Sequence, residues 1–228
     1  MWWPRQKVRP AQLDRARARR AEAHAAAEHL VRVERRFAPL VQRYGLERPI
    51  TTRDPFAALL GSIVQQQISM TAAHAVLQRV RALCPRNRLT AAAIGALRSD
   101  RLRRAGLSRQ KALYVRELAR SFSSGEITAR RLRALPDEEV IALTTQVHGV
   151  GRWTAEMLLI FCLERPDVWP VDDLGLRKGA MRFWDMAEAP TAKALIPRGD
   201  ALRPYRSYAT WYLWRSLEGP LMPGISVD

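Results

Sequence analysis

The sequence has little of what secreted, redox-active or membrane-spanning proteins need. It has 228 residues and only two cysteines, Cys84 and Cys162, both in apolar helical surroundings. Two cysteines form no disulfide framework and cannot alone hold an iron–sulfur cluster, so we expect buried thiols and a reducing cytosol. No apolar run reaches the roughly 18 residues of a membrane span. The N-terminus, MWWPRQKVRP, lacks the apolar core of a signal peptide. We therefore expect a cytoplasmic protein, associated with the nucleoid if it is bacterial.

Lysine is also scarce, and acidic residues are outnumbered. Only four of the 38 basic residues are lysine, and the formal net charge is +16 with a pI of about 11.2. Such an excess favours a polyanionic partner, most commonly nucleic acid. A membrane surface is the competing partner, but it calls for a basic helix with an aromatic face. Residues 11–36 are basic with a mostly alanine face, so we rank membrane binding below nucleic acid.

Strand-like alternation is nearly absent, and nearly every periodic segment predicts a helix. Asp54 followed by Pro55 is typical of a helix start, with a capping side chain and then a proline at the first helical position. Pro136 followed by the acidic residues 137–139 marks another start, because carboxylates are favourable at the positive end of the helix dipole. The predicted helices cover residues 11–44, 55–64, 68–83, 89–97, 98–105, 108–123, 136–148, 151–163, 172–185 and 200–217. We expect an all-α protein with many short helices.

The first chemical motif is VHGVGRWTAE, residues 147–156, in which Gly149 and Gly151 bracket Val150 ahead of an apolar helical pattern. Glycine is used where the backbone needs a positive φ or where another backbone must come close. A glycine turn that opens a helix also directs unpaired N–H groups outward, where they bind phosphate. An ordinary tight turn between two helices explains the same residues, and the spacing alone favours that ordinary turn.

The second motif is WPVDDLGLRKG, residues 169–179, where Asp172 and Asp173 precede a helical run. One of the two carboxylates is expected to cap the new helix, and the other projects into whatever lies beside it. In so basic a chain, a fixed carboxylate near DNA opposes binding, and such a charge is tolerable where a reaction needs it.

The third motif is RPYRSYATWYLWR, residues 203–215, which crowds one helix with aromatic side chains. We expect Tyr208 and Tyr212 to lie in the core. Trp211 and Trp214 are three residues apart and share a face of the helix. Together with Trp153 they would wall a pocket for a flat, electron-poor ligand.

The fourth motif is GSIVQQQISMTAA, residues 61–73, with three consecutive glutamines between two apolar helices. The glutamines are either a solvated corner between helices or a polar wedge that fills space in a base stack.

In their order and spacing, VHGVGRWTA, PVDDLGLRKG and RPYRSYATWYLWR resemble the helix-hairpin-helix DNA glycosylase superfamily, from about Asp54 to about Leu217. The branch that the chain most resembles is the AlkA-type 3-methyladenine DNA glycosylase II, in a compact form without the N-terminal β domain. The resemblance implies an endonuclease III-like fold with two helical subdomains that flank a cleft. They would comprise residues 50–168, with the hairpin at 140–163, and residues 1–49 plus 169–228. It also implies a monomer that acts on double-stranded DNA containing damaged bases.

The same resemblance assigns the catalytic groups. Asp173 matches the catalytic aspartate, which leaves Asp172 as the helix cap, although some relatives have valine before a single aspartate and the alignment stays open by one residue. Trp153 stands where bifunctional relatives have a nucleophilic lysine, so no Schiff base forms there and the enzyme is expected to be monofunctional. The base pocket would be lined by Trp153, Met157, Trp211 and Trp214.

Further roles follow from the resemblance. Gln67 would fill the space of the flipped base. The DNA backbone would be bound at Gly149, Val150, Gly151, Arg152 and Thr154. No cofactor is required, and a structural Na⁺ or K⁺ would be held by the backbone carbonyls of Thr145, Val147 and Val150.

The predicted function is therefore that of a monofunctional DNA N-glycosylase that excises alkylated purines, such as 3-methyladenine and 7-methylguanine, in base excision repair. Two alternatives stay open. One is a glycosylase of broader range for deaminated or ethenopurine bases, and the other is a helix-hairpin-helix module that binds DNA without catalysis. Such a module explains the charge and the hairpin, but not the paired aspartates or the tryptophan-lined face.

Overall fold

The computed structural model describes residues 10–46 and 52–218. In these two ranges every regular element is helical, which confirms the predicted all-α class. Within the same ranges no helix is both long and apolar enough to cross a membrane. The chain divides into two compact units: unit 1 consists of residues 1–49 and 166–228, and unit 2 consists of residues 50–165. The boundary lies after residue 165, whereas the sequence placed it after residue 168.

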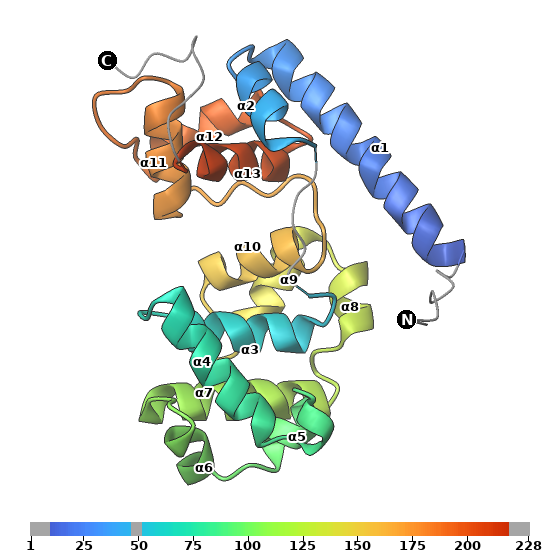
Figure 1. Ribbon diagram of the computed structural model, residues 1–228, viewed down its shortest axis with the longest axis vertical. Coiled ribbons are helices and arrows are strands. Elements are labelled where there is room, and N and C mark those ends of the chain that lie inside the picture. The colour runs from blue at the N-terminus through green and yellow to red at the C-terminus, as the bar shows by residue number, and fades with distance from the viewer. Residues whose placement is uncertain (1–9, 47–51, 219–228) are drawn as a thin grey trace, which may run out of the picture. The chain divides into compact units, whose positions relative to one another are not determined.

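The helices of each unit are shown in Figure 1. Unit 1 contains α1 (Pro10–Val33), α2 (Phe37–Tyr44), α11 (Leu174–Phe183), α12 (Ala192–Asp200) and α13 (Arg206–Ser216). Unit 2 contains α3 (Pro55–Gln65), α4 (Met70–Ala82), the short 3-10 helix η1 (Pro85–Asn87), α5 (Ala91–Gly95), α6 (Ser99–Arg104), α7 (Arg109–Ser123), α8 (Ala129–Ala134), α9 (Asp137–Thr144) and α10 (Arg152–Phe161).

The core of unit 1 is built around α13, which packs against α1, α2 and α11. Tyr208 and Tyr212 of α13 are buried, as the sequence predicted. The Tyr212 hydroxyl donates a hydrogen bond to the Gly45 carbonyl at 2.8 Å, and burial raises the pKa of Tyr212 to about 12. Gly179 allows α11 to approach α13 closely, because a Cβ at residue 179 would overlap the carbonyl of Leu213.

The core of unit 2 is built around α3, which packs against α4, α7 and α10. Its start is the predicted one: the Asp54 carboxylate accepts a hydrogen bond from the Phe56 N–H at 3.0 Å, and Pro55 takes the first helical position. Cys84 and Cys162 are free, buried thiols, as predicted. Burial raises the pKa of both, that of Cys162 to about 11.

The single helix predicted over residues 11–44 is wrong, because the chain forms α1 and α2 with a break between Val33 and Phe37. Pro39 explains the break. In a continuous helix its ring would clash with the carbonyl of Arg35, four residues earlier. Within the first turn of α2 the proline is tolerated, because that turn contains N–H groups without helical partners.

Candidate active site

The hairpin between α9 and α10 uses its two glycines for different purposes. Gly149 has φ +84°, and a Cβ there would overlap the Tyr114 ring, so both its conformation and its surroundings require glycine. Gly151 has φ −88° and ψ 173°, a conformation open to any residue, and a Cβ there would meet no atom within 4 Å. Gly151 precedes α10 without a side-chain cap. The open space therefore lies where the first N–H groups of the helix begin.

The side chains around this turn differ in their access to a ligand. The Arg152 guanidinium donates to Glu138 at 2.6 and 3.0 Å and to Glu156 at 3.2 Å. The hydrogen bond that Arg152 donates to Glu138 raises the pKa of Arg152. Val150 and Thr154 are buried, with 4% and 2% of their surface exposed. Burial argues against direct DNA contacts by the side chains of Val150 and Thr154, so the predicted role of the hairpin rests on its backbone.

The backbone oxygens predicted to hold a cation belong to the same turn. The Val147 carbonyl already accepts a hydrogen bond from the Val150 N–H at 3.0 Å. Neutral carbonyl oxygens are suitable ligands for K⁺ or Na⁺, and an oxygen with two lone pairs can serve a donor and an ion together. The donor chemistry of Thr145, Val147 and Val150 therefore fits a monovalent cation. Among the described residues, no group of three or more histidine, cysteine or acidic side chains is arranged to hold a metal ion.

The glutamine turn joins α3 to α4 and is tied to the hairpin. Gln67 has φ +58°, an uncommon left-handed conformation for a residue other than glycine. The Gln66 side-chain amide donates to the Gly149 carbonyl at 2.8 Å. Lys111 of α7 donates to the carbonyls of Val64 at 2.7 Å and Gln66 at 2.6 Å, and burial lowers the pKa of its amine.

Lys111 is thus a structural support of the glutamine turn that sequence reasoning missed. A lysine on an amphipathic helix gives no signal of its own, because the two carbonyls that it binds come from residues about 45 positions earlier.

Within unit 2, a cavity of about 340 Å³ is lined by Ser62, Gln65, Gln66, Gln67, Ile68 and Trp153. Trp153 is 40% exposed. Met157 lies one turn further along α10, partly buried, on the same face of the helix. The structure therefore brings the predicted wedge residue and the predicted base-stacking residue to one cavity.

Asp173 caps α11. Its Oδ1 accepts hydrogen bonds from the Leu176 backbone N–H at 2.5 Å and from the Trp214 indole N–H at 2.7 Å. The expectation that Asp172 is the cap is wrong, because α11 begins at Leu174, two residues later than predicted, and places Asp173 at the N-cap. Asp172 is exposed. The cap and the predicted catalytic carboxylate are one residue, and Gly175 leaves room for its bond to Trp214.

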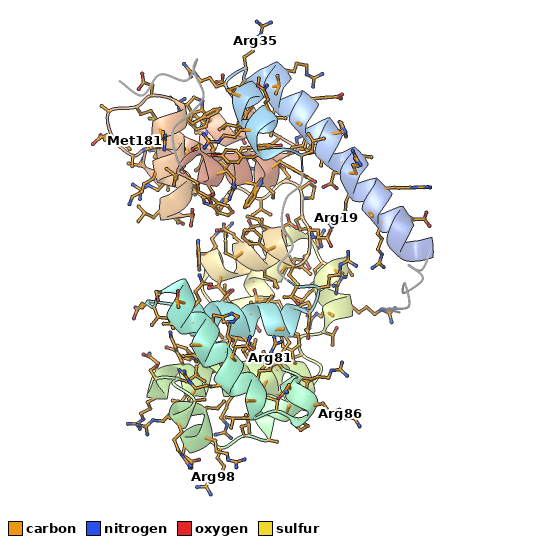
Figure 2. The ribbon with its side chains drawn as sticks, viewed as in Figure 1. Arg19, Arg35, Arg81, Arg86, Arg98 and Met181 are labelled. Carbon is orange, nitrogen blue, oxygen red and sulfur yellow. The ribbon has the colours of Figure 1, made fainter. Side chains whose placement is uncertain are left out.

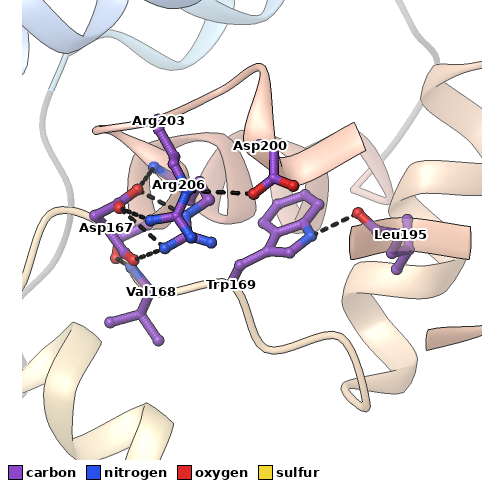
Figure 3. Close-up of polar contacts among 8 residues, drawn as sticks. Asp167, Val168, Trp169, Leu195, Asp200, Arg203 and Arg206 are labelled. Carbon is purple, nitrogen blue, oxygen red and sulfur yellow. Dashed lines mark hydrogen bonds and ion pairs between the residues drawn. The ribbon is translucent and has the colours of Figure 1, made fainter. Parts of the chain in front are cut away.

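Figure 3 shows the contacts that hold the start of the segment leading to Asp173. The Asp167 carboxylate accepts from the guanidinium of Arg206 at 2.7 and 2.9 Å and from that of Arg203 at 2.9 Å. The Trp169 indole donates to the Leu195 carbonyl at 2.9 Å. The Asp173 N–H then donates to the Pro170 carbonyl at 2.9 Å. These bonds fix the backbone on which the carboxylate stands.

The two tryptophans of α13 have separate surroundings. Trp214 binds Asp173, a contact that the sequence did not predict. Trp211 is partly buried against the core of unit 1, and the Arg215 guanidinium lies 5.4 Å from its ring centre. The predicted site residues thus form two sets, Trp153 and Met157 with Gln67 in unit 2, and Asp173 with Trp214 and Trp211 in unit 1. A pocket shared by the two sets stays a prediction.

Comparison with known proteins identifies the family of the chain. Residues 60–198 match the family model of the HhH-GPD superfamily base excision DNA repair proteins. DNA-3-methyladenine glycosylase 1 of Schizosaccharomyces pombe is 33% identical over 184 residues, which cover 80% of this chain and 81% of that protein. The chain belongs to the HhH-GPD superfamily.

Two solved structures have folds similar to that of this chain. The 3-methyladenine DNA glycosylase Mag1 of S. pombe, in complex with abasic DNA, has a TM-score of 0.79 at 30% identity. This match covers 87% of this chain and 98% of that one. A DNA-3-methyladenine glycosidase of Bacillus halodurans has a TM-score of 0.76 at 33% identity, over 83% of this chain and 88% of that one.

Proposed function

We propose that this protein is a DNA-3-methyladenine glycosylase of type II, which hydrolyses the N-glycosyl bond between an alkylated purine and deoxyribose in double-stranded DNA. The names of the relatives support this activity, since two of the proteins similar to the chain over most of its length, one from S. pombe and one from B. halodurans, are glycosylases of 3-methyladenine. We expect the protein to act as a monomer and to initiate base excision repair.

The observation that carries the proposal is the fixed carboxylate of Asp173. As the base departs, positive charge develops on the deoxyribose. A carboxylate already held in place by Leu176 and Trp214 stabilises that charge without having to reorganise. The same group orients the attacking water. A 3- or 7-alkylated purine is itself cationic and leaves readily, so the site needs no strong general acid.

Trp153 supports cleavage of the glycosidic bond alone. Its indole has no amine to attack the sugar, so the position that holds a lysine in bifunctional relatives cannot form a Schiff base here. Its partly exposed ring beside the cavity offers a stacking surface for a flipped, electron-poor base. Gln67, at the left-handed turn of the same cavity, would occupy the space that the base leaves in the duplex.

The hairpin supports the binding of the DNA backbone. The N–H groups that begin α10 have the orientation and the dipole that favour phosphate. A Na⁺ or K⁺ held by the carbonyls of Thr145, Val147 and Val150 would add positive charge beside that phosphate. We expect no other cofactor.

The experiment is a panel of defined lesions in duplex DNA, scored for release of the free base. We expect release of 3-methyladenine and 7-methylguanine, with intact product strands until alkali is added. Hypoxanthine and ethenoadenine in the same panel test the broader range, and binding without any release would favour the non-catalytic module. A borohydride-dependent covalent adduct with the wild-type protein would contradict the monofunctional assignment and implicate another amine, such as Lys111 or Lys178.

Replacing Trp153 by alanine tests the base-stacking role. We expect Trp153→Ala to weaken excision of 3-methyladenine by about 1–3 kcal/mol, the usual scale for base–aromatic stacking. Met157→Ala is the matched variant one turn along α10, and it should cost less because an aliphatic side chain stacks less well. Equal losses in the two variants would argue against stacking on the indole.

A further inference from the structure

Helix α1 changes character along its length. From Ala23 onward it buries Ala23, Ala26, Ala27 and Leu30, a spacing of three and four residues that forms one stripe against the core of unit 1. Between Asp14 and Glu22, all of which are described, no residue is buried. The hydrogen bond from the Tyr208 hydroxyl to Glu22, at 2.6 Å, marks the point where the helix meets the core. We call residues 14–21 the basic arm.

In the basic arm, arginines occupy the face of α1 that is buried in the later half of the helix. Seven residues, two helical turns, separate Ala26 from Arg19 and Ala27 from Arg20, so both arginines stand on the stripe that packs in the later half. An arm that packed against protein would carry apolar residues there. The arm is helical for a different reason: alanine and arginine are among the best helix formers, and the anchored half of α1 spares it the cost of nucleation.

The charge of the arm excludes several partners. Residues 14–21 contain four arginines and one acidic residue, Asp14, a net charge of +3 from four positive charges minus one negative. The remaining residues are Ala16, Ala18 and Ala21, so the arm has no large apolar side chain that would insert into a membrane or a protein groove. Figure 2 shows Arg19 on this part of the helix. The charge complement of such a helix is a dense row of anions.

We propose that the basic arm binds the phosphates of duplex DNA beyond the damaged base, an inference that rests on DNA being the partner of the proposed function. Guanidinium groups donate paired hydrogen bonds to phosphate. A helix of about 10–12 Å diameter fits a major groove of about 12 Å width. Arg15, Arg17, Arg19 and Arg20 lie on more than one side of the helix, so in a groove they reach phosphates of both strands. The arm would lengthen the DNA footprint without touching the reacting base.

The test uses the full chain with Arg15, Arg17, Arg19 and Arg20 all changed to glutamine, which keeps a good helix former while removing the charge. A second variant has lysine at the same four positions. A third changes Arg81, Arg86, Arg98 and Arg103, exposed arginines of unit 2, to glutamine, so that the total charge falls by the same amount elsewhere. Circular dichroism and Tm establish that each variant is folded.

The measurement is the dissociation constant for undamaged duplexes of increasing length, over a range of salt concentrations. For the glutamine arm variant we expect the slope of log K against log salt to become shallower by about two to four units, roughly one for each phosphate that the arm no longer binds. The wild-type protein should gain affinity as the duplex is lengthened, and the arm variant should lose that gain. The lysine variant should retain most of the slope and of the gain, because phosphate binding depends mainly on charge.

Several outcomes would overturn the proposal that the basic arm binds DNA phosphates. They are an unchanged slope in the glutamine arm variant, the same loss of length dependence in the unit 2 variant, or a lysine variant as weak as the glutamine one. Tight binding of the arm variant to DNA combined with loss of binding to an acidic protein would also overturn it, by identifying a different class of partner. Base release by the wild-type protein is recorded on a lesion-containing duplex in parallel. If the wild-type protein binds DNA through the arm but releases no base, the proposed function is refuted, whereas the proposal that the arm binds DNA is supported.

Discussion

Helices α10 and α11 begin in opposite ways. Gly151 precedes α10 and offers no side chain, so that end of the helix has an open approach. Asp173 precedes α11 and occupies its end with a carboxylate that also binds Trp214. Both positions have ordinary extended backbone angles, so the contrast lies in the side chain and not in the turn.

The contrast relates one physical feature to the two roles proposed for these helix ends, phosphate binding and catalysis. The positive end of a helix attracts anions. An end without a cap can receive a phosphate from outside, whereas a capped end holds its own carboxylate still, ready to face a developing positive charge. The first arrangement suits binding and the second suits catalysis, and each can be removed separately.

The largest effect should follow from Asp173→Asn. Asparagine is an equally good helix cap and keeps an oxygen for Leu176 and Trp214, so the free energy of unfolding should hardly change. Loss of the negative charge should lower single-turnover excision of 3-methyladenine by a factor on the order of 10²–10³ or more. DNA binding should be kept or become tighter, because a charge that repels phosphate is gone. Asp172→Asn is the control; normal excision in Asp173→Asn with loss in Asp172→Asn would move the catalytic role by one residue.

Next in size is the difference between Gly149→Ala and Gly151→Ala. Alanine at residue 149 would be forced to a positive φ and into the Tyr114 ring, and should cost about 1–3 kcal/mol of stability in urea unfolding. Alanine at residue 151 should change stability by less than about 1 kcal/mol but weaken DNA binding, since its methyl group enters the space in front of α10. Equal stability of the two variants, or full DNA affinity in Gly151→Ala, would remove the distinction between the two glycines.

Lys111→Met tests the support of the glutamine turn between α3 and α4. Methionine fills a similar volume but leaves the carbonyls of Val64 and Gln66 without their donor, at a cost of about 1–3 kcal/mol in unfolding free energy. Excision should also slow, because the Gln66–Gly149 bond and the conformation of Gln67 depend on the same turn. Lys111→Arg keeps a donor and should recover part of both losses. Wild-type Tm and excision in Lys111→Met would show that the turn does not need this lysine.

The smallest effect concerns Glu138, whose carboxylate binds Arg152 beside the open end of α10. Glu138→Gln should tighten DNA binding by at most about fivefold, the range for an exposed ion pair of up to about 1 kcal/mol. Glu139→Gln removes the same charge one residue away without releasing Arg152. The same gain from both variants would mean that only net charge matters.

The pair should also have a small pH signature. The hydrogen bond from Arg152 lowers the pKa of Glu138. The stability that the pair contributes is therefore present above the ordinary glutamate pKa of about 4.3 and is lost as the pH falls through the lowered value in the folded protein. The free energies of unfolding of the wild type and of Glu138→Gln, measured as a function of pH, should become equal in acid.

Much of the helical framework could be read from the sequence because local signals specify it. Asp54 with Pro55 gave the start of α3, and the periodicity of α13 gave the burial of Tyr208 and Tyr212. The short α8 was not predicted, since its six residues bury only Leu132 and show little periodicity. The helix α12 was missed as well, because Pro197 stands inside it and a proline ordinarily ends a helix.

The site was predictable in its residue types but not in its contacts. The pair Asp172 and Asp173 signalled a helix start, yet which one caps depends on whether the helix begins one residue earlier or later, and the sequence pattern does not resolve this. The bond between Trp214 and Asp173 joins residues 41 positions apart, and the bond between Gln66 and Gly149 joins residues 83 apart. Such pairings arise from tertiary packing, which local sequence patterns do not indicate.

The burial of the two cysteines bears on how the protein resists the methylating agents whose DNA damage it would repair. Methylating agents that damage purines also attack sulfur, and the reactive form of cysteine is the thiolate. Because burial raises the pKa of Cys162 to about 11, its side chain is a neutral thiol at pH 7. Burial also withholds both sulfur atoms from solvent. Since the chain has no other cysteine, it presents little thiol to an alkylating agent and should keep its activity while DNA accumulates lesions.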